Sequence, residues 1–188
     1  MQIFKIIRIL LLPGFLFLYF AACSQVPIVS AGTIKHFEKF PSKFVEARNV
    51  DVWLPPGYDQ KKKYAVVYMQ DGQMLFDSSF TWTRTEWKTD ETVSRLLEEK
   101  KIKDCIIVGI WNTSAGRHAD YFPQKAFELL PKYQQDSIYK ANKTAGGDLF
   151  NNTTIHSDNY LRFMVSELKP FIDSAFSTES NRQNTFIA

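Results

Sequence analysis

One corner of the sequence, Asp71-Gly72-Gln73, joins an apolar run directly to an acid and a glycine. The run before it, residues 64–70, is rich in β-branched and aromatic side chains, which is typical of a strand buried on both faces. An Asp-Gly pair is a common turn sequence, so a plain turn is one interpretation. The alternative is that the corner takes part in chemistry, and other residues must decide between the two.

Three tryptophans stand close to the ends of expected strands: Trp82, Trp87 and Trp111. Ligand sites of α/β proteins form at the carboxyl ends of strands, so these rings could line a cleft for an aromatic or acyl group. Packing in the core is the alternative for each ring.

The groups that could act as bases, nucleophiles or metal ligands are few. The three histidines, His36, His118 and His156, are interpreted as surface side chains rather than as bases. Ser114 lies only four residues before His118, too close for a catalytic pair to be assigned without a structure, and Ser166 falls within an expected helix. No cluster of potential ligands has the spacing of a metal site, so we expect neither a metal nor a cofactor.

The first 23 residues have the composition of a secretory signal. Basic residues near the start precede an almost wholly apolar stretch over residues 9–22, which ends in Ala-Ala-Cys. This stretch is shorter than the roughly 20 residues that a transmembrane helix needs. The ending resembles the lipobox of bacterial lipoproteins, in which the cysteine is lipidated, although Phe20 stands where that motif usually has Leu. We expect an exported protein anchored in the bacterial cell envelope membrane through lipid on Cys23, or a secreted protein after simple cleavage.

The composition favours a folded domain without a nucleic-acid partner. Apolar residues make up 45% and charged residues 23%, as in globular domains. The formal net charge is +3, and the short lysine clusters at 61–63 and 100–101 flank apolar runs instead of forming a basic stripe. With Cys23 assigned to lipid, Cys105 remains alone in an apolar run, so we expect a buried thiol and no disulfide.

The sequence indicates a βαβ unit around the Asp71 corner. Residues 64–70 and 105–110 are continuous apolar runs, as in buried strands, and residues 90–101 between them have one apolar side, as in a helix. Such a crossover makes the two strands parallel. A further strand with one buried face is predicted by the alternation of Val50, Val52 and Leu54.

The remaining segments complete one domain, which we place at residues 44–188. Residues 24–43 are interpreted as a tether and entry segment, and residues 111–157 as a long polar excursion without strong periodicity. Residues 159–176 follow the spacing of one apolar helix face, with a bend expected at Pro170. Residues 184–188 open another strand.

Four segments, in chain order, resemble the "Putative esterase" family of the α/β-hydrolase superfamily, which includes enterochelin esterase-like and feruloyl esterase-like enzymes. They are residues 50–58, residues 64–73, residues 106–110 followed by Asn112, Arg117, Asp120, Tyr121 and Pro123, and residues 167–173. The resemblance covers residues 44–188. It implies an α/β-hydrolase-type, mostly parallel sheet with flanking helices, of which this chain carries the N-terminal part.

The resemblance gives the Asp71 corner a role. In that family the strand ending in Asp-Gly leads to the oxyanion hole, where backbone N–H groups stabilise the charge that develops on the former carbonyl oxygen. By position, the donor here is the backbone N–H of Gln73, while Gly72 lets the backbone turn close to the substrate and Asp71 braces the loop. Trp82 and Trp111 then become candidate contacts for a small-molecule or glycan-linked ester substrate.

A serine esterase also needs a nucleophile elbow, Gly-x-Ser-x-Gly, followed by an acid and a histidine. No Gly-x-Ser-x-Gly occurs in the 188 residues, and the strand opening near Thr185 stands where the family runs into that elbow. We therefore expect an exported carboxylic-ester hydrolase, present as a fragment that lacks its nucleophile, base and acid and is inactive alone. The alternative is a non-catalytic surface lipoprotein, in which the same half-sheet and aromatic cleft bind a glycan or a siderophore-like ligand.

Overall fold

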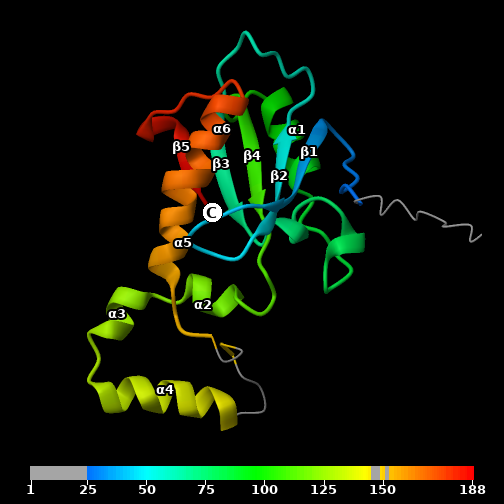
Figure 1. The fold of residues 1–188 in the computed structure, drawn as a ribbon. Helices are drawn as coiled ribbons and strands as arrows, with labels where there is room; N and C mark the ends of the chain where they lie inside the picture. Colours follow the sequence, from blue (N-terminus) through cyan, green and yellow to red (C-terminus); the bar gives the residue numbers. More distant parts are fainter. Residues whose placement is uncertain (1–24, 145–148, 151–152) are drawn as a thin grey trace, which may run out of the picture.

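A computed structural model of the chain describes residues 25–144, 149–150 and 153–188. They form a five-stranded sheet in the order β1-β2-β4-β3-β5, with α1 on one face and α5 and α6 on the other (Figure 1). The strands are β1 (Thr33–Phe40), β2 (Arg48–Leu54), β3 (Ala65–Gln70), β4 (Cys105–Ile110) and β5 (Thr185–Ile187). None of the helices in those ranges is long and apolar enough to cross a membrane. Cys23 and the rest of the expected signal segment lie outside the described residues.

The βαβ unit predicted around the Asp71 corner is confirmed. β3 and β4 are parallel, and the helix between them, α1, spans Thr89–Glu98. The two strands end level with each other, because Gln70 pairs with Ile110. The residues that follow them, Asp71 and Trp111, therefore leave the sheet at the same edge.

The interpretation of residues 24–43 as a tether and entry segment is wrong in part, because it contained no strand. Residues Thr33–Phe40 form β1, which pairs antiparallel with β2 at one edge of the sheet. The sequence does not reveal this strand, because the alternation of its inward and outward side chains is interrupted by a register irregularity between Phe37 and Phe40. The chain before β1 is also held by the domain, since the Ser30 N–H donates to the Asp90 carboxylate (2.7 Å).

β5 confirms the strand expected near residue 185. It lies parallel to β3, and Ala188 continues the ladder beyond it. The Ala188 N–H donates to the Tyr68 carbonyl (2.9 Å), and the Ala188 carbonyl accepts from the Gln70 N–H (3.0 Å). β3 is therefore paired on both sides, and Ala188 lies beside the strand end that leads into the Asp71 corner.

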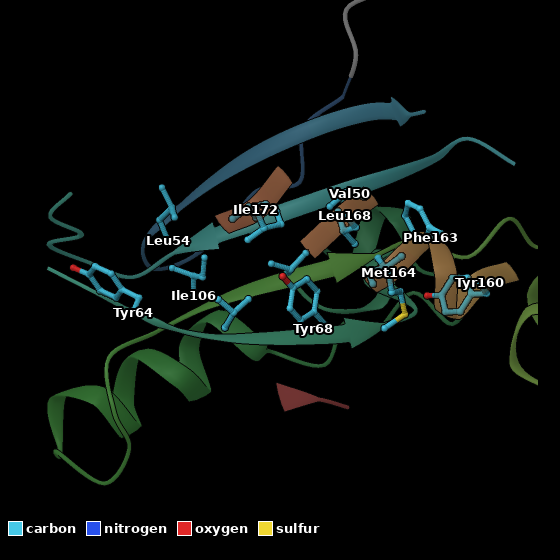
Figure 2. Packing of buried hydrophobic residues seen from close by; sticks show 14 residues of the cluster. Val50, Leu54, Tyr64, Tyr68, Ile106, Tyr160, Phe163, Met164, Leu168 and Ile172 are labelled. Atoms are coloured by element: carbon cyan, nitrogen blue, oxygen red, sulfur yellow. The ribbon is translucent and has the colours of Figure 1, made fainter. Parts of the chain in front are cut away.

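The helix predicted over residues 159–176 is present in three parts: α5 (Ser157–Phe163), a π-helical turn (Met164–Leu168) and α6 (Lys169–Ala175). The π-helical turn comes just before Pro170, where a bend is expected, because a residue without an N–H interrupts the helical ladder. The apolar face of the three-part helix packs on the sheet and forms the main core (Figure 2). The labelled core residues are Tyr160, Phe163, Met164, Leu168 and Ile172 from the helix, with Val50, Leu54, Tyr64, Tyr68 and Ile106 from the sheet side.

The polar excursion contains more helix than predicted. It holds α2 (Arg117–Tyr121), α3 (Gln124–Glu128) and α4 (Lys132–Thr144), and Figure 1 shows α3 and α4 projecting from the sheet. α2 and α3 have five residues each, too few for a helical period to be recognised in the sequence. A satellite core holds the excursion together, and its buried residues are Ala119, Phe127, Phe150 and Ile155.

Candidate functional site

The Asp71 corner is a sharp turn at the carboxyl end of β3. Asp71 adopts the left-handed conformation (φ 54°), which is uncommon for a residue with a side chain and is enriched at functional sites. The chain then enters a single 3-10 turn, η1 (Gly72–Met74), in which the Met74 N–H donates to the Asp71 carbonyl (2.8 Å). Aspartate is one of the few side-chain-bearing residues that tolerate this conformation.

The Asp71 carboxylate is held by three side chains from the segment after β4. Arg117 donates through Nε (2.9 Å) and Nη2 (2.6 Å), Asn112 through Nδ2 (2.8 Å) and Tyr121 through its hydroxyl (3.3 Å). Burial raises the pKa of Asp71, but hydrogen bonds from Arg117 and Asn112 outweigh it, so the pKa lies below its usual value. The ionised carboxylate, whose side chain is only 7% exposed, therefore clamps the corner to this segment. We call this group of four residues the Asp71 clamp.

Sequence reasoning missed the clamp. In the sequence, Asn112, Arg117 and Tyr121 are noticed only because of the family resemblance, and the resemblance assigns them no role. They lie 41, 46 and 50 residues from Asp71, and no periodicity connects them to it. The available signal is that adjacent parallel strands end at one edge, so polar residues that follow each strand can meet there.

We expect Asp71→Asn to lower the free energy of unfolding at pH 7 by about 2 kcal/mol, because it leaves Arg117 without its carboxylate. The loss is smaller than for a fully buried pair, since 34% of the Arg117 side chain is exposed to screening water. The pKa of Asp71 is lowered in the folded state, so its stabilising effect is complete above the unfolded pKa of roughly 3.9. The effect is lost as the pH falls through the lower folded pKa.

Urea denaturation at pH 7 and at acidic pH measures this effect, and the difference between wild type and Asp71→Asn should shrink in acid. The matched control is Asp136→Asn, which breaks the exposed ion pair between Asp136 and Lys132 (2.8 Å). Exposed pairs of this kind contribute little to stability. Equal losses from the two variants at pH 7 would show that the clamp does not stabilise the fold.

Gly72 is required by a close approach between two backbones. A Cβ at this position would lie 2.5 Å from the carbonyl carbon of Gly109 and 2.8 Å from its oxygen. Gly109 belongs to β4, so η1 rests directly on the neighbouring strand. The close backbone approach at Gly72 is thus an approach to β4.

We expect Gly72→Ala to lower the free energy of unfolding by at least about 2 kcal/mol, because the backbone of η1 or β4 must shift. Gly57→Ala is the matched control. Gly57, unlike Gly72, has a positive φ (71°), but open space surrounds the position of its missing Cβ, so only a backbone penalty of about 1 kcal/mol applies. Thermal or urea unfolding compares the two variants, and an equal loss would contradict the close approach.

Gln73 presents a backbone N–H beside a cavity. Among the described residues this N–H has no acceptor, whereas the side-chain Oε1 accepts from the Asn112 N–H (3.2 Å). The cavity of about 380 Å³ brings Gln73 together with Trp82 and Trp111, and this volume suits a small-molecule site. Its other lining residues are Ser79, Phe80, Thr81, Arg84, Asn112 and Ser114.

The tryptophans differ in their surroundings. Trp82 is 60% exposed, so core packing does not explain it, and the Arg117 guanidinium lies 6.0 Å from its ring centre. Trp111 is half-buried and meets Phe80 edge-to-face, with ring centres 5.3 Å apart. Trp87, the third candidate, is exposed and is not among the residues that line the cavity.

Within the described part of the chain, no serine hydroxyl is hydrogen-bonded to a histidine. His36 contacts Asp51 and its side chain is only 4% exposed, so the surface interpretation is wrong for this histidine, which lies on the unforeseen strand β1. His156 Nε2 lies 2.9 Å from Asp120 Oδ1, without the geometry of a hydrogen bond. Ser114 lines the cavity, but no histidine hydrogen-bonds its hydroxyl. Nor do these residues include a group of three or more His, Cys, Asp or Glu that could hold a metal ion.

The mixed sheet, its parallel β3-α1-β4 unit and the corner after β3 define an α/β-hydrolase-type fold with flanking helices. The family described as "Putative esterase" matches residues 42–188, and the chain belongs to this family. The enterochelin and feruloyl esterase resemblance seen in the sequence is therefore confirmed at the level of the family.

Solved structures agree with this assignment. A ferulic acid esterase from Anaeromyces mucronatus, solved in complex with ferulic acid, is 25% identical, with a TM-score of 0.52 over 85% of this chain and 48% of that chain. An IroE-like serine hydrolase from Shewanella oneidensis is 27% identical, with a TM-score of 0.54 over 78% of this chain and 40% of that chain. The BES protein from Bacillus cereus, 18% identical with a TM-score of 0.52 over 87% of this chain and 52% of that chain, shares the fold. The chain thus spans about half the length of the solved structures that it matches.

Proposed function

We propose that the chain forms the oxyanion side of a serine carboxylic-ester hydrolase. The observation that carries the proposal is the Gln73 N–H, which finds no acceptor within the described ranges. It is held at the carboxyl end of β3 by the Asp71 clamp and by the contact between Gly72 and Gly109. In acyl transfer, an N–H fixed in this way stabilises the charge that develops on the former carbonyl oxygen. In α/β-hydrolases the loop after this strand supplies one such donor, and the residue after the nucleophile supplies the other.

The register of β5 supports the same proposal. Because the Ala188 carbonyl accepts from Gln70, a residue that follows Ala188 would leave the sheet at the edge where Gln73 lies. We propose that a Gly-x-Ser-x-Gly elbow follows there in the complete protein. Its serine would attack the ester carbonyl, a histidine would take the serine proton and pass it to the leaving alcohol, and the Gln73 N–H would hold the oxyanion.

The proposed substrate is a small-molecule or glycan-linked ester with an aromatic part. The cavity beside Gln73 carries two indole rings, those of Trp82 and Trp111. Aromatic groups pack favourably against such rings in offset or edge-to-face arrangements. The similar esterase from Anaeromyces mucronatus was solved with ferulic acid, which is itself aromatic, and this supports the same choice.

Covalent labelling tests the proposed function. A fluorophosphonate probe reacts with an activated serine, so the protein continued beyond Ala188 is expected to be labelled at the serine of Gly-x-Ser-x-Gly. Residues 1–188 alone are expected to remain unlabelled. Peptide mass spectrometry locates the label, and a label on Ser114 would place the nucleophile in the cavity and overturn this assignment.

We further propose that the protein is exported and lipidated. The support is the apolar stretch over residues 9–22 and the Ala22-Cys23 ending. The mature protein is expected to begin at a lipid-modified Cys23 and to partition with membranes, which mass spectrometry of the N-terminal peptide checks. Cys23→Ala should abolish the lipid-bearing peptide. An intact Met1, or cleavage elsewhere with an unmodified Cys23, would contradict the lipoprotein proposal.

A further inference from the structure

A buried carboxylate on β2 has no part in the Asp71 clamp. Asp51 is fully buried, as are its neighbours Val50 and Val52, so β2 is covered on both faces rather than on the single face that its alternation predicts. A charged group inside an apolar sheet is unfavourable unless hydrogen bonds satisfy it. The two partners that satisfy Asp51 are His36 and Trp111.

Both carboxylate oxygens of Asp51 are used. Oδ1 lies 2.6 Å from His36 Nδ1, and Oδ2 accepts a 2.5 Å hydrogen bond from the indole Nε1–H of Trp111. Burial raises the pKa of Asp51, and the hydrogen bonds with His36 and Trp111 offset part of the rise. His36 lies on β1, Asp51 lies on β2, and Trp111 directly follows β4. The group therefore joins three neighbouring segments.

These contacts fix the indole of Trp111. Its backbone N–H donates to the Asn49 carbonyl (3.0 Å), and its ring meets His36 and Phe80 edge-to-face, with ring centres 5.9 and 5.3 Å apart. The same indole lines the cavity that contains Gln73. It cannot rotate to widen or close the cavity without breaking its hydrogen bond to a buried carboxylate.

We infer that Asp51 is a positioning residue: together with His36 it orients Trp111 as a rigid wall of the cavity, and thereby sets the affinity of the cavity for a planar aromatic acid. The consequence for ester selection rests on the proposed function, whereas the positioning and the binding need no turnover. A carboxylate suits this role because it can accept from both partners at once. Asparagine can replace it in part, since its oxygen accepts from Trp111 and its amide donates to a neutral His36, but leucine can do neither.

Indole ¹H–¹⁵N NMR of the full chain tests this role, with ferulic acid as the probe and Trp111→Phe to assign the Trp111 signal. In the wild type, the Trp111 indole proton should be protected from solvent exchange, and ferulic acid should shift its signal. Asp51→Leu should move the signal toward that of an exposed indole and weaken ferulic acid binding by about three- to tenfold. Asp51→Asn should retain most of both properties. The control Trp87→Phe should change neither.

Folding is separated from positioning by thermal melting, because leucine in an apolar site can leave stability unchanged. If Asp51→Leu does not fold, His36→Phe takes its place, since it removes one partner of Asp51 and should displace the Trp111 signal by less. The inference is overturned if a folded variant keeps both the Trp111 signal and the ferulic acid affinity of the wild type. It is also overturned if ferulic acid leaves Trp111 unperturbed in the wild type. Absence of turnover in the continued protein, with these results intact, would count against the esterase proposal alone.

Discussion

Residues 1–188, expressed alone, are expected to give no turnover of p-nitrophenyl acetate above a buffer blank. The 188 residues contain no Gly-x-Ser-x-Gly, and no hydrogen bond joins a serine to a histidine in the described ranges, so we expect no activated nucleophile for the covalent step. Removing the nucleophile from a serine protease lowers kcat by about 10⁶-fold. The protein continued through the proposed elbow is expected to exceed the short chain by a factor of this order.

Two alanine variants locate the chemistry. In the continued protein, alanine in place of the elbow serine should return the rate to that of the short chain. In the short chain, Ser114→Ala should have no effect on the blank-level rate. Robust turnover that Ser114→Ala abolishes would place the active site in the Trp82 and Trp111 cavity. A gene that stops at Ala188 would favour the non-catalytic lipoprotein that binds a glycan or a siderophore-like ligand.

The central strands could be predicted because a strand that is buried on both faces consists almost entirely of apolar residues. β3 and β4 are continuous apolar runs, and a helix between two such runs leaves few alternatives to a parallel crossover. β1 could not be predicted, because its register irregularity interrupts the alternation that identifies a strand. The short helices α2 and α3 were missed for a related reason, since each is shorter than two helical turns.

The position of the candidate site could be predicted from the sequence, but the hydrogen bonds that hold its residues in place could not. The Asp-Gly corner and the Gln73 N–H follow from the family resemblance, which supplies the chemistry that the residues alone do not. The partners of Asp71 are distant in sequence, so only the folded chain reveals the clamp. Asp51 illustrates the same limit, because an acid between two valines predicts a solvent-facing side chain, whereas β1 and the segment after β4 bury it.

Gln73→Pro in the continued protein is expected to lower kcat for an aryl ester by about 10²- to 10³-fold with little change in KM, because it removes one donor to the oxyanion. The substitution suits the local backbone, since Gln73 lies in a 3-10 turn whose φ a proline can adopt. Its N–H has no acceptor among the described residues, so proline breaks no hydrogen bond seen in the fold. The preceding residue, Gly72, is the one that best tolerates the restriction that proline imposes on its neighbour.

Gln73→Ala separates the backbone from the side chain. Alanine keeps the N–H and loses only the bond from the Asn112 N–H to the Gln73 side chain (3.2 Å), which contributes about 1 kcal/mol to stability. Its kcat should therefore stay close to that of the wild type, provided that both variants melt cooperatively and are compared below their melting temperatures. If Gln73→Pro retains the kcat of Gln73→Ala, the oxyanion is not held by this N–H, and the Asp71 clamp must serve the fold rather than the reaction.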